Sequence, residues 1–180
     1  MVGIVVGVSL SSTHSFYKEP QESIRLIAGL GVQGDAHMGK MVKHRYFVRT
    51  DPERPNLRQA HLIQAELLDE LQADGFDVGP GALGENITTR GVDLLHLPLG
   101  ARLRIGDAVV LELTELRDPC GQMDDFMPGL KLASLSQDDT GRVTGKAGVM
   151  SIVVVGGVIV PGDPVVVELP PEPHVPLEIG

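Results

Sequence analysis

The sequence has 180 residues, a length suited to one domain with a sizeable hydrophobic core. Its net charge of −9 argues against a sequence-independent role on nucleic acid or on an anionic membrane, because both need a basic protein surface. The 22 glycines and 13 prolines indicate many turns and short elements rather than a long helical bundle.

The single cysteine and the length of the apolar runs bear on the compartment. One cysteine cannot form a disulfide within the chain, which fits a reducing compartment. The N-terminal segment lacks the basic start of a signal peptide, and no apolar run approaches the roughly 18 residues that a membrane span needs. We therefore expect a cytoplasmic protein.

The N-terminal third predicts short strands joined by polar and glycine-rich segments. Residues 2–8 are a β-branched run typical of a buried strand, and 24–27 predict a second, shorter one. The polar residues 9–20 predict a loop, and the glycine-rich stretch 29–39 predicts tight turns. Residues 38–57 are rich in lysine, arginine and proline and predict an exposed, mobile excursion.

The clearest helical pattern begins near Asn56 or Arg58 and runs to about Ala73. Its apolar residues fall on one stripe while its charged residues face water, and Gly75 suits the C-terminal cap. This pattern places Arg58 at a helix start, where free N–H groups favour anions.

From Pro80 onward the pattern changes to short strands at close spacing. The expected strands lie at 87–89, 94–95, 102–105, 109–114, 149–155, 158–160 and 165–169. Residues 148–160 are interpreted as a hairpin, and a weaker helix is expected after Pro128. The pattern predicts a mainly β, barrel-like fold with one main α-helix and one or two short helices. Residues 1–169 form the expected single domain, followed by an extended or frayed proline-rich tail at 170–180.

Cys120 is the leading candidate for chemistry. It follows the strand expected at 109–114, Pro119 ends that strand, and Gly121 loosens the backbone beyond it. Arg117, three residues earlier, could favour the thiolate, the form that attacks electrophiles and binds soft metals. The alternative is a free cysteine that serves as a small buried hydrophobe.

Other polar groups offer weaker signals. Asp35, His37, His44 and His61 could form a metal site, but their spacing matches no compact ligand motif, so structural histidines remain the alternative. Glu85 and Asn86 lie between a glycine turn and a β-branched strand, and such side chains either orient a ligand or tie a loop to the backbone.

Four blocks in a fixed order carry a resemblance to a known family. They are GLGVQGDAHMG (29–39), RQAHLI (58–63), PGALGENITTRGVDLLHLPLGARLRIGDAVVLELTELRDPC (80–120) and AGVMSIVVVGGVIVPGDPVVV (147–167). Together they resemble the MOSC domain, named for the C-terminal domain of molybdenum cofactor sulfurase, and they cover most of the chain. The resemblance implies a β-barrel-like fold with few helices, as the strand pattern does.

The resemblance also implies a role for Cys120. In relatives that act as reductases, the matching thiolate is a ligand of molybdenum in the pterin cofactor, and in the sulfurases the domain is thought to receive sulfur and pass it on. No pyridoxal phosphate site is expected in this chain, so an external electron or sulfur donor is implied. The residues that we expect at the cofactor are His37, Arg58, Glu85, Asn86, Arg90, Arg104 and Arg117. The four arginines are chosen by their position in the sequence only.

Three functions follow from this resemblance. The first is a molybdenum-cofactor enzyme that reduces N-hydroxylated small molecules, with Cys120 as the metal ligand. The second is a sulfur carrier that bears a persulfide on Cys120, and the third is a binding module without turnover. We expect a small-molecule substrate, and neither nucleic acid nor membrane as a partner. The sequence leaves the substrate and the oligomeric state open.

Overall fold

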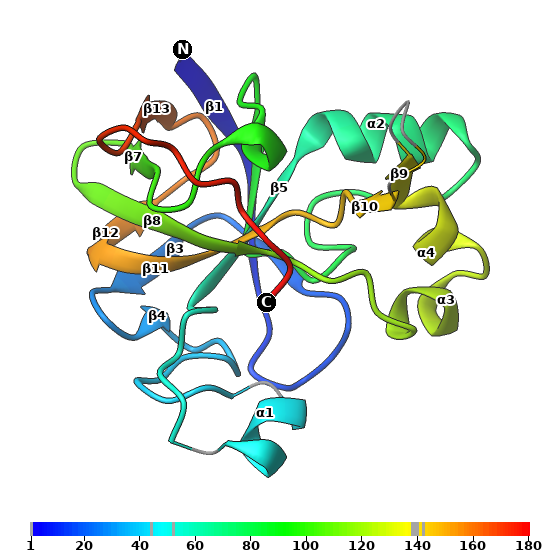
Figure 1. Cartoon of the computed structure of the whole chain (residues 1–180), viewed down its shortest axis with the longest axis horizontal. Coiled ribbons are helices and arrows are strands. Elements are labelled where there is room, and N and C mark those ends of the chain that lie inside the picture. The colour runs from blue at the N-terminus through cyan, green and yellow to red at the C-terminus, as the bar shows by residue number, and fades with distance from the viewer. Residues whose placement is uncertain (1, 44, 52, 138–140, 142) are drawn as a thin grey trace.

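The structure, a computed structural model, describes residues 2–43, 45–51, 53–137, 141 and 143–180. The barrel strands are β1 (Val2–Leu10), β5 (Ala60–Gln64), β6 (Ile87–Arg90), β7 (Arg102–Ile105), β8 (Val109–Leu116), β11 (Val149–Val155) and β13 (Pro164–Glu168). Within the described residues these seven strands run in the order β13-β7-β8-β11-β5-β6-β1, and β1 pairs back with β13 to close the barrel (Figure 1). The predicted mainly β, barrel-like fold is confirmed.

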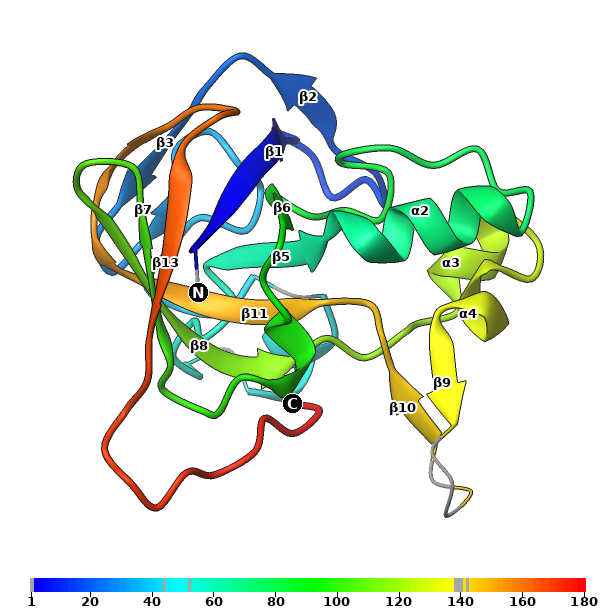
Figure 2. The ribbon, with the colours of Figure 1, turned by 90° about the horizontal axis from the view of Figure 1, so that it is seen from above.

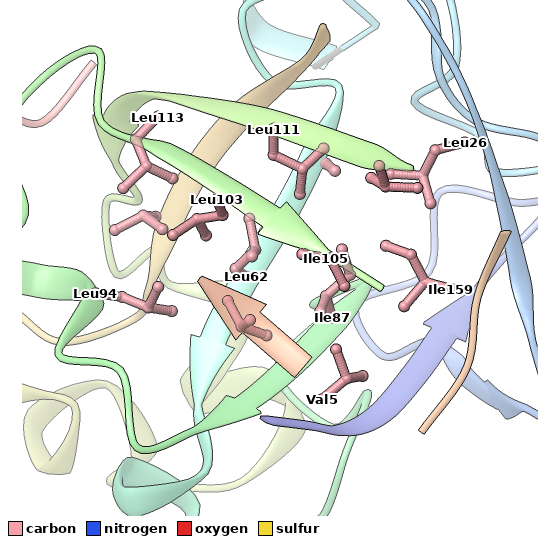
Figure 3. Close-up of a cluster of buried hydrophobic side chains, with 14 of the residues drawn as sticks. Val5, Leu26, Leu62, Ile87, Leu94, Leu103, Ile105, Leu111, Leu113 and Ile159 are labelled. Atoms are coloured by element: carbon pink, nitrogen blue, oxygen red, sulfur yellow. The ribbon is translucent and has the colours of Figure 1, made fainter. Parts of the chain in front are cut away.

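Alternation of apolar and polar residues explains which side chains fill the barrel. In β7, Leu103 and Ile105 are fully buried while Arg102 and Arg104 point outward. Leucine, isoleucine and valine side chains from all around the barrel meet in its interior (Figure 3). All neighbouring pairs in the closed barrel are antiparallel except β5 with β6.

The remaining strands lie outside the closed barrel. They are β2 (Glu19–Gln21), β3 (Ile24–Ile27), β4 (Gly31–Val32), β9 (Leu135–Gln137), β10 (Val143–Gly145) and β12 (Gly157–Ile159). The helices are α1 (Arg45–Thr50), α2 (Ala65–Ala73), the 3-10 turn η1 (Leu94–His96), α3 (Gln122–Phe126) and α4 (Leu130–Ala133). Figure 2 shows α2, α3 and α4 gathered on one side of the barrel. None of the helices in the described residues is long and apolar enough to cross a membrane.

A second apolar cluster joins these helices to the barrel. Leu67 and Leu71 of α2 pack with Met123 of α3, Leu130 of α4 and Leu83, all nearly inaccessible to solvent. This packing fixes the start of α3, and so it anchors the segment that leads from β8 to α3.

Three sequence expectations about elements were wrong. The main helix begins at Ala65, because residues 60–63 are buried as strand β5 between β11 and β6. Residues 94–95 form the 3-10 turn η1 rather than a strand. Residues 148–160 are not a hairpin, since the chain leaves the barrel after β11 and β12 pairs with β3 instead.

The basic excursion and the C-terminal tail are both anchored. Val42 and Asn56 are buried, and the Asn56 amide donates to the carbonyls of His37 and Gly39 at 2.9 Å, so this excursion is tied down near both of its ends. The tail is extended, as expected, and its Leu177 packs into the barrel core rather than fraying. Backbone hydrogen bonds join the tail to residues 99 and 116.

Candidate functional site

A cavity of about 870 Å³ brings together five of the eight predicted site residues. It is lined by the loop from β1 to β2, the segment after β4, the α1 excursion and the segment between β8 and α3. The predicted residues that line it are His37, Arg58, Asn86, Arg117 and Cys120. They lie far apart in the sequence, and the fold makes them one site.

Cys120 is held between two anchored points. β8 ends at Leu116, and Pro119 packs so closely on Gly145 that a Cβ there would lie 2.6 Å from the proline Cδ. On the other side, buried Met123 donates its N–H to the Cys120 carbonyl at 3.1 Å. The half-buried thiol lies 3.8 Å from Gln122 Oε1. The structure thus places the thiol at a strand-to-helix junction in the cavity wall.

Arg117 carries a buried donor without a partner. Its guanidinium lies over the Phe16 ring at 5.6 Å, and its Nη1 is shielded from solvent with no hydrogen-bond acceptor among the described residues. Burial lowers the pKa of Arg117, and the negative charge of a Cys120 thiolate is the strongest of the neighbours that oppose this shift. Because an unsatisfied buried donor is costly, this group is suited to receive an anionic ligand.

Arg58 lies in the cavity wall, as expected, but not at the start of a helix, as the sequence pattern predicted. It precedes strand β5 rather than a helix, so no helix N-terminus supports an anion there. Its guanidinium pairs with the Glu115 carboxylate and donates to the Gly180 carbonyl at 2.8 Å. Arg58 therefore ties the tail to the barrel at the edge of the cavity.

Asp35 is the centre of a buried polar network. Its Oδ2 accepts from Lys18 Nζ at 2.7 Å and from Asn86 Nδ2 at 2.9 Å, while Oδ1 accepts from the backbone N–H of His37 at 3.0 Å. The His37 Nδ1 lies 3.2 Å from the same Oδ1. Burial opposes the ionised carboxylate, but the hydrogen bonds from His37 and the charge of Lys18 outweigh it and hold the pKa of Asp35 well below its ordinary value.

Two further histidines lie in the cavity wall. His14 stacks on His37 with ring centroids 5.0 Å apart. His61 is buried, and its Nε2 donates to the Ala147 carbonyl at 2.8 Å. Burial holds the pKa of His61 well below its usual range, so this ring is neutral.

Glu85 and Asn86 serve mainly to tie loops. The fully buried Glu85 carboxylate accepts from Gly81 N–H at 2.6 Å, from Thr88 Oγ1 at 2.9 Å and from Leu83 N–H at 3.2 Å, and burial raises its pKa. Glu85 does not line the cavity. Asn86 does line it, although its amide is engaged by Asp35 and by the Ser9 carbonyl.

Arg90 and Arg104, chosen by position only, do not reach the cavity. Arg90 forms a bidentate pair with Asp69 on the surface, at 2.7 and 3.0 Å. Arg104 points outward from β7 and pairs with Glu168. Both arginines already have carboxylate partners.

Sequence reasoning missed several cationic residues of the cavity. Lys18 lies in a polar loop without a motif, whereas Lys43 and Arg49 belong to the basic excursion, whose charge was visible in the sequence. Lys43, Arg49 and Arg117 make no ion pair with any described residue, and Asp118 is the one acidic residue among the described lining. An acidic protein thus presents a cavity with an excess of positive charge.

The histidine metal site considered from the sequence receives no support from the geometry. His44 lies outside the described residues, and His61 is engaged by a backbone carbonyl. Over the part of the chain that is described, no group of three or more histidine, cysteine or acidic side chains is placed to hold a metal ion.

Comparison with known proteins agrees with this fold. The family model of the MOSC domain matches residues 35–166. The YuaD protein from Bacillus subtilis has a similar structure, with a TM-score of 0.76 and 23% sequence identity over 95% of this chain and 98% of that one. The YiiM proteins of Escherichia coli and Geobacillus stearothermophilus are also similar. Their TM-scores are 0.63 and 0.61 at 20% and 19% identity, over 97% and 98% of this chain and 73% and 80% of theirs. No curated protein matches the sequence. The chain belongs to the MOSC domain family.

Proposed function

We propose that this protein binds the molybdenum-pterin cofactor in the cavity, with Cys120 as the metal ligand, and reduces N-hydroxylated small molecules. One observation carries the proposal: a thiol and an arginine with a buried, unpartnered donor share one large, cation-rich cavity. A soft thiolate suits molybdenum, and the cations suit the cofactor's phosphate.

The cavity fits such a group in size and charge. Its volume of about 870 Å³ lies within the ordinary range for small-molecule sites. Arg117 would meet the phosphate or another anionic group of the cofactor through its free Nη1, and Lys43 and Arg49 add positive charge. When bound, the cofactor supplies two-electron redox chemistry.

The protein's own residues bind and orient. The Phe16 ring and the chain around Pro119 hold Arg117 and Cys120 in place, and neutral His61 adds no positive charge beside them. An external electron donor would supply the electrons. The single free thiol suits a reducing compartment, and the cytoplasm is the location that we propose.

Metal and pterin analysis tests this function. The chain is purified from a molybdenum-replete, cofactor-competent host as wild type, Cys120→Ala, Arg117→Met and Arg104→Met. We expect molybdenum and pterin in stoichiometric amounts in the wild type and in Arg104→Met, loss of bound molybdenum in Cys120→Ala, and reduced loading in Arg117→Met. Equal loading of all four proteins would contradict the assigned site.

Two further measurements separate the alternatives. Cyanide-releasable sulfur on Cys120 without bound metal would overturn the reductase in favour of a sulfur carrier. Loaded protein with a dye-reduced electron donor is then assayed with a hydroxylamino purine. Formation of the amino purine supports the reductase, whereas loading without turnover supports a binding module.

A further inference from the structure

The pair of His37 and Asp35 is built like a proton-transfer group. The Asp35 carboxylate fixes the ring through Nδ1 and also accepts the backbone N–H of the same histidine. No described residue supplies a hydrogen-bond partner for Nε2 of His37, and the side chain, 31% exposed, lines the cavity that holds Cys120. One ring nitrogen is thus positioned by the protein, and the other is left for a ligand.

The support behind this pair is charged and buried. Lys18 and Asp35 form an ion pair with side-chain exposures of 5% and 2%. Such a pair contributes little net stability compared with apolar residues of similar volume, so its presence in a cavity wall calls for a functional reason. The hydrogen bonds from His37 and the charge of Lys18 together keep Asp35 ionised against the effect of burial, and an ionised Asp35 can receive the Nδ1–H of His37 without taking its proton.

We propose that His37 is the acid that protonates the leaving oxygen of an N-hydroxylated substrate, with Asp35 and Lys18 as its positioning residues. This inference rests on the proposed reductase function. Histidine is the side chain best suited to exchange a proton near neutral pH, which makes it the commonest general acid in enzymes.

The reaction balances with this assignment. Reduction of R–NHOH to R–NH₂ and water consumes two electrons and two protons. The N–O bond breaks, nitrogen is reduced by two electrons that come from an external reduced electron carrier, and the Nε2 proton of His37 goes to the departing oxygen, which leaves as water. The second proton, and the one that restores His37, come from solvent, which reaches this ring.

Other titratable groups around the cavity are less suited to this step. His61 is held neutral and its Nε2 is committed to the Ala147 carbonyl. Lys18 is committed to Asp35, and the Nε2 of His14, whose ring stacks on His37, lies 3.1 Å from the Lys43 carbonyl.

Nitrogen-15 NMR on the cofactor-free chain tests the positioning without any activity. We expect neutral His37 to carry its proton on Nδ1 and to leave Nε2 unprotonated, and the Asp35→Asn variant to shift this preference. His96, which pairs with Asp93 on the exposed surface at 2.8 Å, is the matched comparison. A proton on Nε2 in the neutral wild type would overturn the proposed positioning, even if the variant does not fold.

Kinetics of the loaded protein then tests the chemical role. In His37→Gln we expect unchanged molybdenum content, a kcat lower by about 10²- to 10⁴-fold and a pH profile without the fall in rate at high pH that a general acid produces. His96→Gln should keep the wild-type rate, and added imidazole should partly restore a His37→Ala variant. If the wild type is active and His37→Gln matches it, this inference fails and the reductase stands. If the wild type takes up no cofactor or shows no turnover, the proposed function fails, and so does this role of His37.

Discussion

The buried ion pair in the cavity wall makes Asp35→Asn the most informative substitution for stability. The change would leave the Lys18 ammonium, 5% exposed, without its counter-charge at 2.7 Å. It would also turn an amide N–H₂ towards at least one of the N–H donors whose hydrogen bonds the carboxylate now accepts. Removing one partner of a buried pair costs about 3–5 kcal/mol. At about 2–4 °C per kcal/mol for a chain of this size, we expect the melting temperature to fall by about 6–20 °C.

Thermal and urea unfolding followed by circular dichroism would measure this loss. Asp69→Asn, which breaks an exposed pair with Arg90, is the control and should change the melting temperature little. Adding Lys18→Met to Asp35→Asn removes the stranded charge and should recover part of the loss. The reasoning would be refuted if Asp35→Asn costs no more than Asp69→Asn, or if Lys18→Met deepens the loss in the double variant.

The pH dependence of that loss, and two further substitutions, give additional tests. Because the pKa of Asp35 is lowered in the fold, its contribution is fully present above the unfolded value of about 3.9, so the gap between wild type and Asp35→Asn should shrink as the pH falls below it. His61 also has a lowered pKa, so its unfolded state binds more protons, and between about pH 6.5 and 5 it should reduce stability by up to about 1.4 kcal/mol per pH unit as the pH falls. Buried Glu85, whose pKa is raised, acts in the opposite direction. The contribution of His61 is therefore obtained by comparing how the unfolding free energies of wild type and His61→Gln change with pH over this range. The same pH dependence in both proteins would contradict a buried, neutral His61. Gly84 has φ +84° and an added Cβ would collide with the Phe16 carbonyl oxygen, so Gly84→Ala should cost at least about 1–2 kcal/mol, whereas Gly79→Ala, with open space around its Cβ, should be nearly neutral by the same unfolding assay.

Local pattern predicted the barrel strands well, because alternation and β-branching report burial on a pleated sheet. It failed at residues 60–63, where four successive buried residues suit a strand enclosed in a barrel as well as the first turn of a helix. It also failed at β12, because two glycines between apolar runs resemble a hairpin turn, while the real partner, β3, lies far away in the sequence. The local alternation of apolar and polar residues does not indicate which distant strand is the pairing partner.

The site was predictable only in part for a related reason. Cys120 and Arg117 are close in sequence and lie together in the fold. The resemblance in ordered blocks singled out Cys120, whereas Arg117 was chosen by its position in the sequence. Arg104 was chosen by position, and its alternation with Leu103 and Ile105 already placed it outside the barrel. Lys18 and Asp35 lie in two different loops that the fold brings together, and no short sequence motif indicates such a contact.

The most direct test of the assigned site is a crystal structure of the protein purified from molybdenum-replete cells, with anomalous data collected across the molybdenum absorption edge. The site described above predicts one anomalous peak bonded to Cys120 Sγ, with the pterin phosphate on the cationic side of the cavity near Arg117. A molybdenum peak elsewhere, or bound cofactor that makes no contact with Cys120, would contradict it.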